Sequence, residues 1–421
     1  MKNHDKAKIW IGFDDTDTPE FGCTTATFDD LLTILSELPN FQIIERRLVR
    51  LWPFAERRTR GNGALSCIIE IATTSIDDFE KLLSDFFLFL DDQLKYRKGS
   101  INSNTSPGLV YCFEELDEEL YWEAVRQKVE ISDRIKKLSG IKKMSLYSEW
   151  GLIGASSAAA WKPNEKSTWE LIAWRHPEKI GTKREITNSI IKKMEIKHPE
   201  TFVNRDPTQE KGLIAPRTPC PVLYGIRGST SQAVLSAHEW LQTNDEVEKC
   251  QRFAIHRTNQ LSDDHVLGFS TSTVLTNPEE TKGAHSSLNV TFHGTSKTLV
   301  AFKEGGDVNR LLRKLIPGDK ISWLGLESPD GSIHLERLRV ESSVPRIIGR
   351  PKCCDGKTMR SGGINQPLRC KVCQKNLEKH WLFEDIDISD LDVINGWVEP
   401  NPSQRRHLSR PLLFGEPIKI K

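Results

Sequence analysis

The order of apolar patterns between residues 8 and 113 constrains the fold of this chain more than any other feature. A short apolar run at 9–13 reads as a strand, and apolar residues then recur at helical spacing over 28–38. Two further strand-like runs, near 42–51 and 64–73, precede a second helical pattern at 79–90. The segment therefore predicts strand, helix, strand, strand, helix, strand, the order of a split βαβ, ferredoxin-like layer.

Three aspartates, Asp14, Asp15 and Asp17, follow the first strand where it ends. Clustered carboxylates repel one another unless a cation lies among them, and Mg²⁺ binds hard oxygen ligands together with nucleotide phosphates. Thr24 lies at the start of the next helix, where free backbone donors attract anions. The segment predicts a magnesium and phosphate site, or, in a purely structural interpretation, a helix cap made by a threonine hydroxyl.

Two glycine-containing segments follow. Arg60, Gly61, Asn62 and Gly63 form a basic loop between the middle strands, and its glycines allow a ligand to approach the backbone. The same residues also fit an ordinary turn before a strand. The segment 151–154 precedes an alanine and serine run, which fits a closely packed helix or a phosphate loop, although its spacing matches neither the Walker pattern nor the dinucleotide fingerprint. Residues 117–138 read as a mostly solvent-facing helix.

Length and charge predict several modules and no membrane segment. The chain has 421 residues, 37% of them hydrophobic, and a net charge of +1, as in soluble globular proteins. It contains no apolar run long enough to span a membrane and no apolar N-terminal segment, so we expect a cytoplasmic location. The nine cysteines are mostly scattered singly, which argues against a disulfide framework.

Residues 265–343 carry a second alternating pattern. Three strands near 271–276, 287–292 and 298–302 precede a helix at 307–315, and two more strands follow. This order resembles an OB-fold β-barrel, which commonly binds single-stranded nucleic acid or oligosaccharide through aromatic and basic side chains. Phe302 and Trp323 are candidate contacts, with core packing as the alternative.

Residues 344–381 are rich in lysine and arginine, so phosphate backbone is a plausible partner. Four cysteines cluster there: Cys353, Cys354, Cys370 and Cys373. The second pair is a regular CxxC knuckle, and the first lies at the right distance before it for a zinc ribbon. Because adjacent cysteines hold two thiolates less readily than CxxC, Asp355 or His380 is an alternative ligand.

Taken in order, the motifs resemble one family along the whole chain. They are FDDTD, GCTT, TRGNGA, GLIGA, ELIAWRHPEKIGTKRE, PVLYGIRG, the OB-like module, the ribbon and RRHLSRP. The chain resembles the archaeal tRNA-isoleucine 2-agmatinylcytidine synthetase family. The resemblance implies a multidomain α/β and α+β protein with a kinase-like α/β domain at 1–150, a ferredoxin-like domain at 151–264, an OB-fold domain at 265–343, and a zinc ribbon with a tRNA-binding tail at 344–421.

The resemblance also implies an activity. The family uses ATP and Mg²⁺ to join agmatine to C2 of the wobble cytidine in the isoleucine tRNA with a CAU anticodon, so that the modified tRNA reads AUA. The cytidine O2 is phosphorylated first, and the agmatine amine then displaces phosphate. Two alternatives remain open from the sequence: a non-catalytic tRNA-binding protein with a degenerate first module, and a different nucleotide-dependent kinase.

Carried over by position, the resemblance assigns residues to four roles. The catalytic residues are Asp14, Asp15, Asp17 and the phosphorylated Thr24; ATP and its phosphates contact Arg60, Gly61, Asn62, Gly63, Gly151 and Gly154; the tRNA contacts Arg405, Arg406, His407 and Arg410; structural zinc is bound by Cys353, Cys354, Cys370 and Cys373. The family's TNPG segment reads Thr105-Ser106-Pro107-Gly108 here, so the asparagine of that motif is absent.

Overall fold

The computed structural model describes residues 6–18, 21–59, 61–98 and 105–420, and it separates into two compact units. Unit 1 consists of Met1–Leu267 and Asn401–Pro411, and unit 2 consists of Gly268–Pro400 and Leu412–Lys421. The chain thus leaves unit 1, forms most of unit 2, and returns to unit 1 for a short segment.

The first half of unit 1 has the element order that the sequence predicts. Its elements are β1 (Lys6–Asp14), α1 (Thr24–Leu35), β2 (Gln42–Arg50), β3 (Gly63–Ala72), α2 (Ile76–Lys98), β4 (Gly108–Cys112) and β5 (Lys142–Ser145). The strands lie in the order β5-β4-β1-β3-β2, with antiparallel pairing throughout. β1 therefore occupies the middle of this layer.

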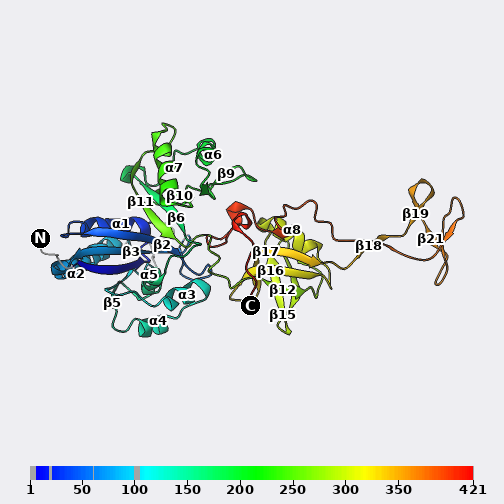
Figure 1. The fold of residues 1–421 in the computed structure, drawn as a ribbon, viewed down its shortest axis with the longest axis horizontal. Helices are drawn as coiled ribbons and strands as arrows, with labels where there is room; N and C mark the ends of the chain where they lie inside the picture. Colours follow the sequence, from blue (N-terminus) through cyan, green and yellow to red (C-terminus); the bar gives the residue numbers. More distant parts are fainter. Residues whose placement is uncertain (1–5, 19–20, 60, 99–104, 421) are drawn as a thin grey trace. The chain divides into compact units, whose positions relative to one another are not determined.

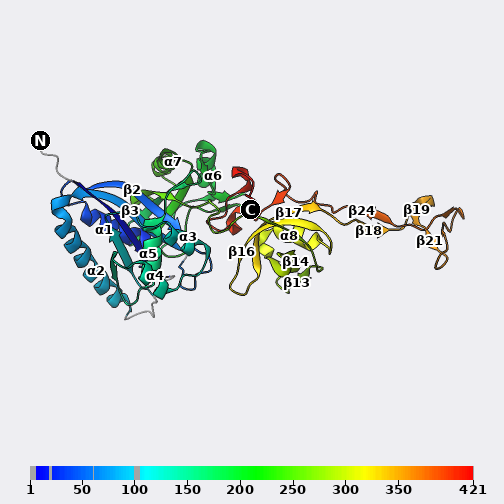
Figure 2. The same cartoon turned by 60° about the horizontal axis from the view of Figure 1, so that its bottom comes forward.

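Alternation along β1 assigns its side chains to two cores. Ile9, Ile11 and Phe13 pack with the apolar sides of α1 and α2, whereas Trp10 packs on the opposite face with α3 (Glu119–Arg126) and α5 (Gly151–Ala160). In Figure 2, α2 lies along the outer side of this layer. Helices cover both faces, so β1, which ends at Asp14, is buried on both sides over most of its length.

The second half of unit 1 repeats this arrangement. Its elements are β6 (Thr168–Arg175), α6 (Asn188–Lys197), β7 (Thr201–Phe202), the hairpin β8 (Arg205–Asp206) and β9 (Lys211–Gly212), β10 (Val222–Gly228), α7 (Ser231–Thr243) and β11 (Cys250–Thr258). The strand order is β11-β6-β10-β7, and β11 pairs in parallel with β2 through Arg257–Arg47 and Thr258–Leu48. The two halves therefore share one nine-stranded sheet (Figure 1).

The segment expected as one solvent-facing helix forms two helices, α3 (Glu119–Arg126) and α4 (Ile131–Lys137), with a buried face. Arg134 of α4 is buried and donates to the hydroxyls of Ser156 and Ser157 on α5 (Gly151–Ala160). The expectation of a single helix was wrong. Most residues of 117–138 are exposed or partly exposed, as expected, but an apolar stripe that includes Leu120 and Tyr121 is buried.

Unit 2 begins with the alternating segment seen in the sequence. Its elements are β12 (Ser270–Thr273), β13 (Glu279–Glu280), β14 (Ser286–Phe292), β15 (Thr295–Ala301), α8 (Asp307–Lys314), β16 (Lys320–Glu327), β17 (Ile333–Ser342) and β25 (Trp397–Val398). The sheet path is β12-β16-β17-β15-β14-β13, and β25 pairs with β17. Trp323 is buried in this core, whereas Phe302 is partly exposed. Core packing is therefore the role of Trp323.

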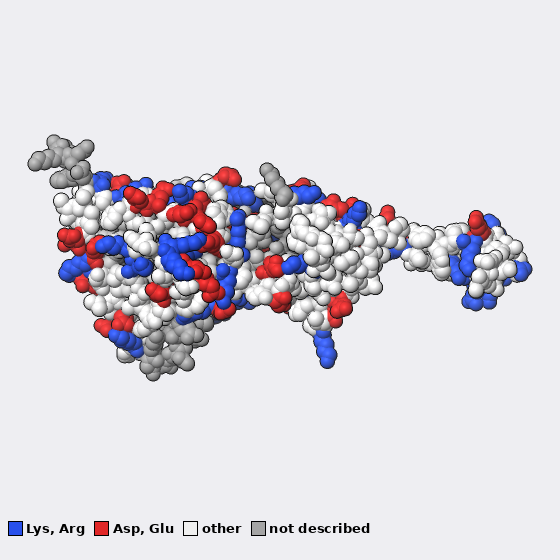
Figure 3. Space-filling view, turned by 90° about the horizontal axis from the view of Figure 1, so that it is seen from below, with Lys and Arg blue, Asp and Glu red and all other residues white. Residues whose placement is uncertain are grey.

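The basic segment forms short two- and three-stranded sheets. These are β18 (Arg346–Gly349) with β24 (Leu382–Glu384), β19 (Lys352–Cys353) with β20 (Lys357–Thr358), and β21 (Arg360–Ser361), β22 (Leu368–Arg369) and β23 (Asn376–Leu377). Figure 3 shows lysine and arginine side chains gathered over the part that holds β19 to β23. Among the helices described in this chain, none is long and apolar enough to cross a membrane.

Candidate active site

The aspartates lie where α5 makes direct backbone contact with the sheet. An added Cβ on Gly12 of β1 would lie 1.9 Å from the carbonyl oxygen of Ala155, and one on Gly154 would lie 1.8 Å from Oδ2 of Asp14. Neither position has room for a side chain. The small-residue run after Gly151 thus forms the closely packed helix that the sequence allowed, and Gly154 forms one wall of the Asp14 site.

Gly151 serves the same packing. A Cβ there would lie 2.3 Å from the carbonyl oxygen of Ser106, and its own N–H donates to that oxygen at 3.2 Å. The next two amides, of Leu152 and Ile153, donate to Glu149 and Trp150. The first donors of α5 therefore already have partners, while the predicted phosphate contacts of Gly151 and Gly154 stay predictions.

Asp14 and Asp15 carry perturbed carboxyl groups. Burial, with the charge of Asp15 next in size, raises the pKa of Asp14 well above its ordinary value of 3.8. Burial also raises the pKa of Asp15 to about 7, although the guanidinium of Arg57 opposes this shift. Asp15 has a left-handed backbone (φ 63°), and its Oδ2 accepts a hydrogen bond from the amide of Ser106 at 3.1 Å. These shifts indicate that the surrounding protein does not balance the negative charge of the two carboxylates. A bound divalent cation would supply the missing positive charge.

Asp17 and Thr24 form a hydroxyl and carboxylate pair. The Thr24 hydroxyl donates to Oδ1 of Asp17 at 3.1 Å, and the Thr59 hydroxyl donates to the same oxygen at 3.0 Å. α1 begins at Thr24, and its N-cap residue, Cys23, makes no side-chain capping bond. The helix-cap interpretation is therefore wrong for Thr24, whose hydroxyl faces a carboxylate instead.

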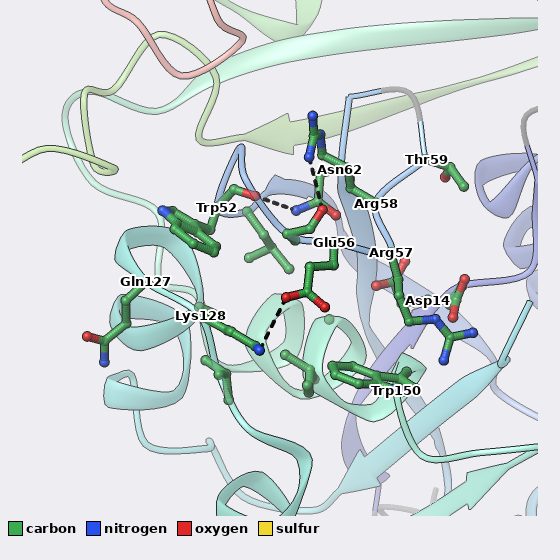
Figure 4. Close-up of a pocket in the computed structure, with 18 residues that line it drawn as sticks. Asp14, Trp52, Glu56, Arg57, Arg58, Thr59, Asn62, Gln127, Lys128 and Trp150 are labelled. Carbon is green, nitrogen blue, oxygen red and sulfur yellow. Dashed lines mark hydrogen bonds and ion pairs between the residues drawn. The ribbon is translucent and has the colours of Figure 1, made fainter. Parts of the chain in front are cut away.

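A first cavity, of about 110 Å³, lies on the Asp14 and Asp15 side (Figure 4). Trp52, Arg57, Lys128 and Trp150 line it together with the two aspartates. Figure 4 shows Arg57 between Asp14 and Trp150, and its guanidinium carbon lies 5.5 Å from the centre of the Trp150 ring. The cavity thus combines aromatic walls with carboxylates and a cation at one end.

A second cavity, of about 420 Å³, lies on the Asp17 and Thr24 side. The two halves of unit 1 both line it, through residues of α1, β2, β6 and β10 and the 213–220 segment. Thr59 and Gly63 line both cavities. Asp14 and Asp15 therefore lie at the first cavity, whereas Asp17 and Thr24 lie at the second.

The glycine loop is shaped around Arg50. A Cβ on Gly61 would lie 2.6 Å from Nη1 of Arg50, and one on Gly63 would lie 2.9 Å from the same atom. Asn62 has φ 46° and donates its side-chain amide to the Trp52 carbonyl at 2.9 Å, so the turn interpretation is confirmed. Arg60 lies outside the described residues, and ligand contacts by this loop stay predictions.

The returning segment Asn401–Pro411 contributes to the second cavity through His407. Arg405 and Arg406 line a neighbouring hollow that shares Arg227 and His407 with that cavity. Arg410 instead donates its amide to Oδ1 of Asp263 at 2.7 Å. The four predicted tRNA-contacting residues thus belong to one short segment but have different surroundings.

The sequence analysis missed a buried polar group at the floor of the second cavity. Glu170 of β6 is 3% exposed, and its carboxylate lies 3.3 Å from Arg50 and 3.4 Å from Arg227. Gln260 donates to the same carboxylate. A glutamate within the apolar run of β6 was the available signal, since an acid in a strand buried on both faces needs charged partners.

The four cysteines of the ribbon come together. Their Sγ atoms all lie within 4.8 Å of one another, and Cys353 lies 3.6 Å from Cys373. Four thiolates around a zinc ion at about 2.3 Å require such spacings. A left-handed residue, Asp355 (φ 54°), follows the adjacent pair, and His380 bonds to the Glu378 carbonyl. The cluster is consistent with a zinc ribbon, and it assembles from cysteines alone.

Comparison with known proteins identifies the family. Residues 10–147 match the TiaS TCKD domain, and residues 149–265 match the TiaS FLD domain. The chain belongs to the TiaS family. The isoleucine tRNA 2-agmatinylcytidine synthetase TiaS of Archaeoglobus fulgidus is 30% identical over 96% of this chain and 97% of its own length. That of Methanosarcina mazei is 31% identical, with the same coverage.

Solved TiaS structures extend the likeness to three dimensions. A complex of TiaS with its isoleucine tRNA and ATP matches with a TM-score of 0.82 and 28% identity, covering 97% of this chain and 98% of that one. A complex of TiaS with the same tRNA, AMPCPP and agmatine matches with a TM-score of 0.78 and 26% identity, covering 97% of both chains. Both units of the chain therefore have counterparts in TiaS.

Proposed function

We propose that this chain is an ATP-dependent ligase that joins agmatine to C2 of the wobble cytidine in the CAU-anticodon isoleucine tRNA and forms 2-agmatinylcytidine for AUA decoding. The observation that carries the proposal is the end-to-end match to TiaS proteins, with solved complexes that contain isoleucine tRNA, ATP and agmatine. The family match and the geometry together oppose a non-catalytic tRNA-binding protein, because the carboxylate and threonine groups are all present between two cavities.

ATP occupies the first cavity in this proposal. Trp52 and Trp150 offer faces for the adenine ring, and Arg57 lies beside the aspartates where phosphates need a cation. Asp14 and Asp15 would hold Mg²⁺, and the bound ion would supply positive charge beside the transferring phosphate. The raised pKa values of these carboxyls support this role, because a divalent cation is the partner that buried, mutually repelling carboxylates require.

Thr24 receives phosphate at the wall of the second cavity. Asp17 accepts the proton of the Thr24 hydroxyl in a 3.1 Å hydrogen bond, which positions the oxygen as a nucleophile. Gly61, Asn62 and Gly63 contact phosphate from the loop between the cavities, with Arg60, and Gly151 and Gly154 contribute from α5. The second cavity, of about 420 Å³, accommodates the cytosine ring and agmatine together.

The order of steps follows from leaving-group chemistry. The O2 of cytidine leaves poorly when an amine attacks C2, whereas the O2 phosphoryl ester leaves readily as phosphate. ATP is therefore consumed to activate the base before agmatine attacks. Two cavities that share Thr59 and Gly63 in their walls suit this sequence of steps, because the phosphate donor and the amine approach different atoms of the cytidine.

The remaining modules hold the tRNA. We propose the division 1–150, 151–264, 265–343 and 344–421 into kinase-like, ferredoxin-like, OB-fold and zinc-ribbon domains, in a cytoplasmic enzyme. In the third, a bridge between Val274 and Val290 links the first strand to β14, as closure of an OB barrel requires. Arg405, Arg406, His407 and Arg410 contact the tRNA, and Cys353, Cys354, Cys370 and Cys373 bind structural zinc.

The decisive experiment is incorporation of radiolabelled agmatine into unmodified CAU isoleucine tRNA in the presence of ATP and Mg²⁺. Wild-type protein should label this tRNA and should not label a variant tRNA with a different wobble base. A Thr24→Ala variant should lose incorporation but still bind tRNA in a filter assay. Folded wild-type protein that transfers no label would refute the activity, and full turnover by the Thr24 variant would remove that residue from the mechanism.

A further inference from the structure

His407 is held firmly in the second cavity by the returning segment. The carbonyl of His407 accepts from the amide of Leu261 at 2.9 Å, and the carbonyl of Leu408 accepts from the amide of Asp263 at 2.9 Å. Leu408 is buried in the core between α3 and α5. These two backbone bonds and the buried Leu408 therefore fix the backbone at His407.

Two neighbours determine the orientation of the Gln260 amide. The Glu170 carboxylate only accepts hydrogen bonds, so the Gln260 NH₂ group faces it. The Arg227 Nε–H only donates, and it lies 2.8 Å from Oε1 of Gln260. Both contacts agree that Oε1 points away from Glu170 and acts as an acceptor.

This amide sets the tautomer of His407. Nδ1 of His407 lies 3.3 Å from Oε1 of Gln260, and an amide oxygen has no proton to give. Nδ1 therefore carries the ring proton, and Nε2 of the neutral ring has a free lone pair. Among the described residues, Nε2 forms no hydrogen bond, and Gly61, which has no side chain, leaves the space beside it open: a Cβ there would lie 2.7 Å from Nε2.

The surroundings of the ring also favour its neutral form. His407 is exposed to solvent and lines the cavity. The surrounding protein, followed by the charges of Arg50 and Arg227, holds the pKa of His407 well below 6.5. The lowered pKa favours an unprotonated Nε2, which lies in the same cavity as the Thr24 hydroxyl.

We propose that His407 is a catalytic residue of the amine-transfer step, in which its Nε2 accepts a proton from the attacking primary amine of agmatine. This inference rests on the proposed function. The C2–N bond forms, the C2–O2 bond breaks with its electron pair leaving on phosphate, and one amine proton passes to Nε2 and from there to the phosphate or solvent. Gln260 and Glu170 are positioning residues, which keep the lone pair of Nε2 toward the cavity.

A weak base is sufficient for this step. The amine nitrogen becomes far more acidic as its lone pair is donated to C2. The proton is therefore transferred after the C2–N bond has begun to form, when a weak base can accept it. A stronger base would be protonated in the cell and unable to act. The same neutral ring is poorly suited to neutralising a phosphate, so the tRNA contact proposed for His407 is with the reacting cytidine and not with the phosphate backbone.

The test separates amine transfer from phosphate transfer. In His407→Asn the side-chain NH₂ replaces the Nδ1 donor to Gln260, but no group replaces Nε2. Agmatine incorporation should fall about 100-fold or more, the usual contribution of a general base, while tRNA-dependent phosphate transfer from ATP stays within about threefold of wild type. Gln404→Ala, an exposed change in the same segment, should behave as wild type in both assays.

Chemical rescue provides the second measurement. In His407→Ala, added imidazole should restore agmatine incorporation in a saturable manner, which a merely structural role would not allow. Wild-type incorporation by His407→Asn, equal losses in both transfers, or absence of rescue in a folded His407→Ala protein would each overturn this proposal while the proposed function stands. Wild-type protein that incorporates no agmatine would overturn both.

Discussion

Replacing Asp15 by asparagine should stabilise the fold and abolish phosphate transfer. Asp15 has a left-handed backbone, which asparagine tolerates almost as well as glycine does. The amide oxygen of asparagine can still accept the Ser106 N–H bond that now measures 3.1 Å. The substitution therefore removes the charge of this carboxylate with little change in shape.

The size of the stabilisation follows from the raised pKa. Burial moves the pKa of Asp15 from 3.8 to about 7, and each unit corresponds to about 1.4 kcal/mol. The upper limit is about 4 kcal/mol, which already includes the opposing charge of Arg57, and partial solvent access reduces this to about 2 kcal/mol. The folded state binds the proton more tightly than the unfolded state, so the wild-type penalty is absent below pH 4, develops as the pH rises to 7, and is constant above that value.

Chemical denaturation at fixed ionic strength measures this effect. Asp15→Asn and wild type should have equal free energies of unfolding at pH 4 and differ by about 2 kcal/mol at pH 8. Mg²⁺ should stabilise wild type more than the variant. Asp92→Asn, on the exposed side of α2, should change stability by less than about 0.5 kcal/mol. A variant that is less stable than wild type at pH 8, or a difference independent of pH, would refute this account of the carboxylate.

Three further changes test other parts of the structure. Gly154→Ala places a methyl group 1.8 Å from Oδ2 of Asp14, so phosphate transfer should fall about 100-fold and stability by about 1–3 kcal/mol; unchanged kinetics would show that α5 can move away. Cys370→Ser should lower the zinc content measured by mass spectrometry, and zinc retained at the wild-type level would reject the ligand set. Glu248→Ala leaves the buried Arg175 without its 2.6 and 2.7 Å partners, and urea denaturation should report a loss of about 3–5 kcal/mol; a loss below about 1 kcal/mol would contradict the importance of this pair.

Local patterns predicted the elements of this fold well. The strand expected at 287–292 is β14 at Ser286–Phe292, and the helix expected at 307–315 is α8 at Asp307–Lys314. Side-chain period and turn residues act within a few positions, so they can be read from the sequence. The parallel pairing of β2 with β11 joins the two halves of unit 1 into one sheet. It could not be predicted, because the paired segments are about 200 residues apart and the pairing produces no periodic pattern in the sequence.

The candidate site, like the fold, could be predicted from the sequence only in part. Asp14, Asp15 and Asp17 were predictable because one strand end and one turn present all three. Their distribution over two cavities was not, since it depends on α5 and on the loop around Gly63. The contact between Gln260 and His407 was beyond prediction for a further reason: residues 147 positions apart meet only after the chain has completed most of unit 2.

The return of Asn401–Pro411 to unit 1 also determines the order in which the residues of the two cavities are synthesised. On the ribosome, every residue of the first cavity emerges before any residue of unit 2, whereas His407 emerges after nearly all of it. In the function proposed above, a nascent chain stopped within unit 2 therefore has the residues of the nucleotide cavity but lacks His407 at the acceptor cavity. We expect such a prematurely terminated product to be unable to transfer an amine.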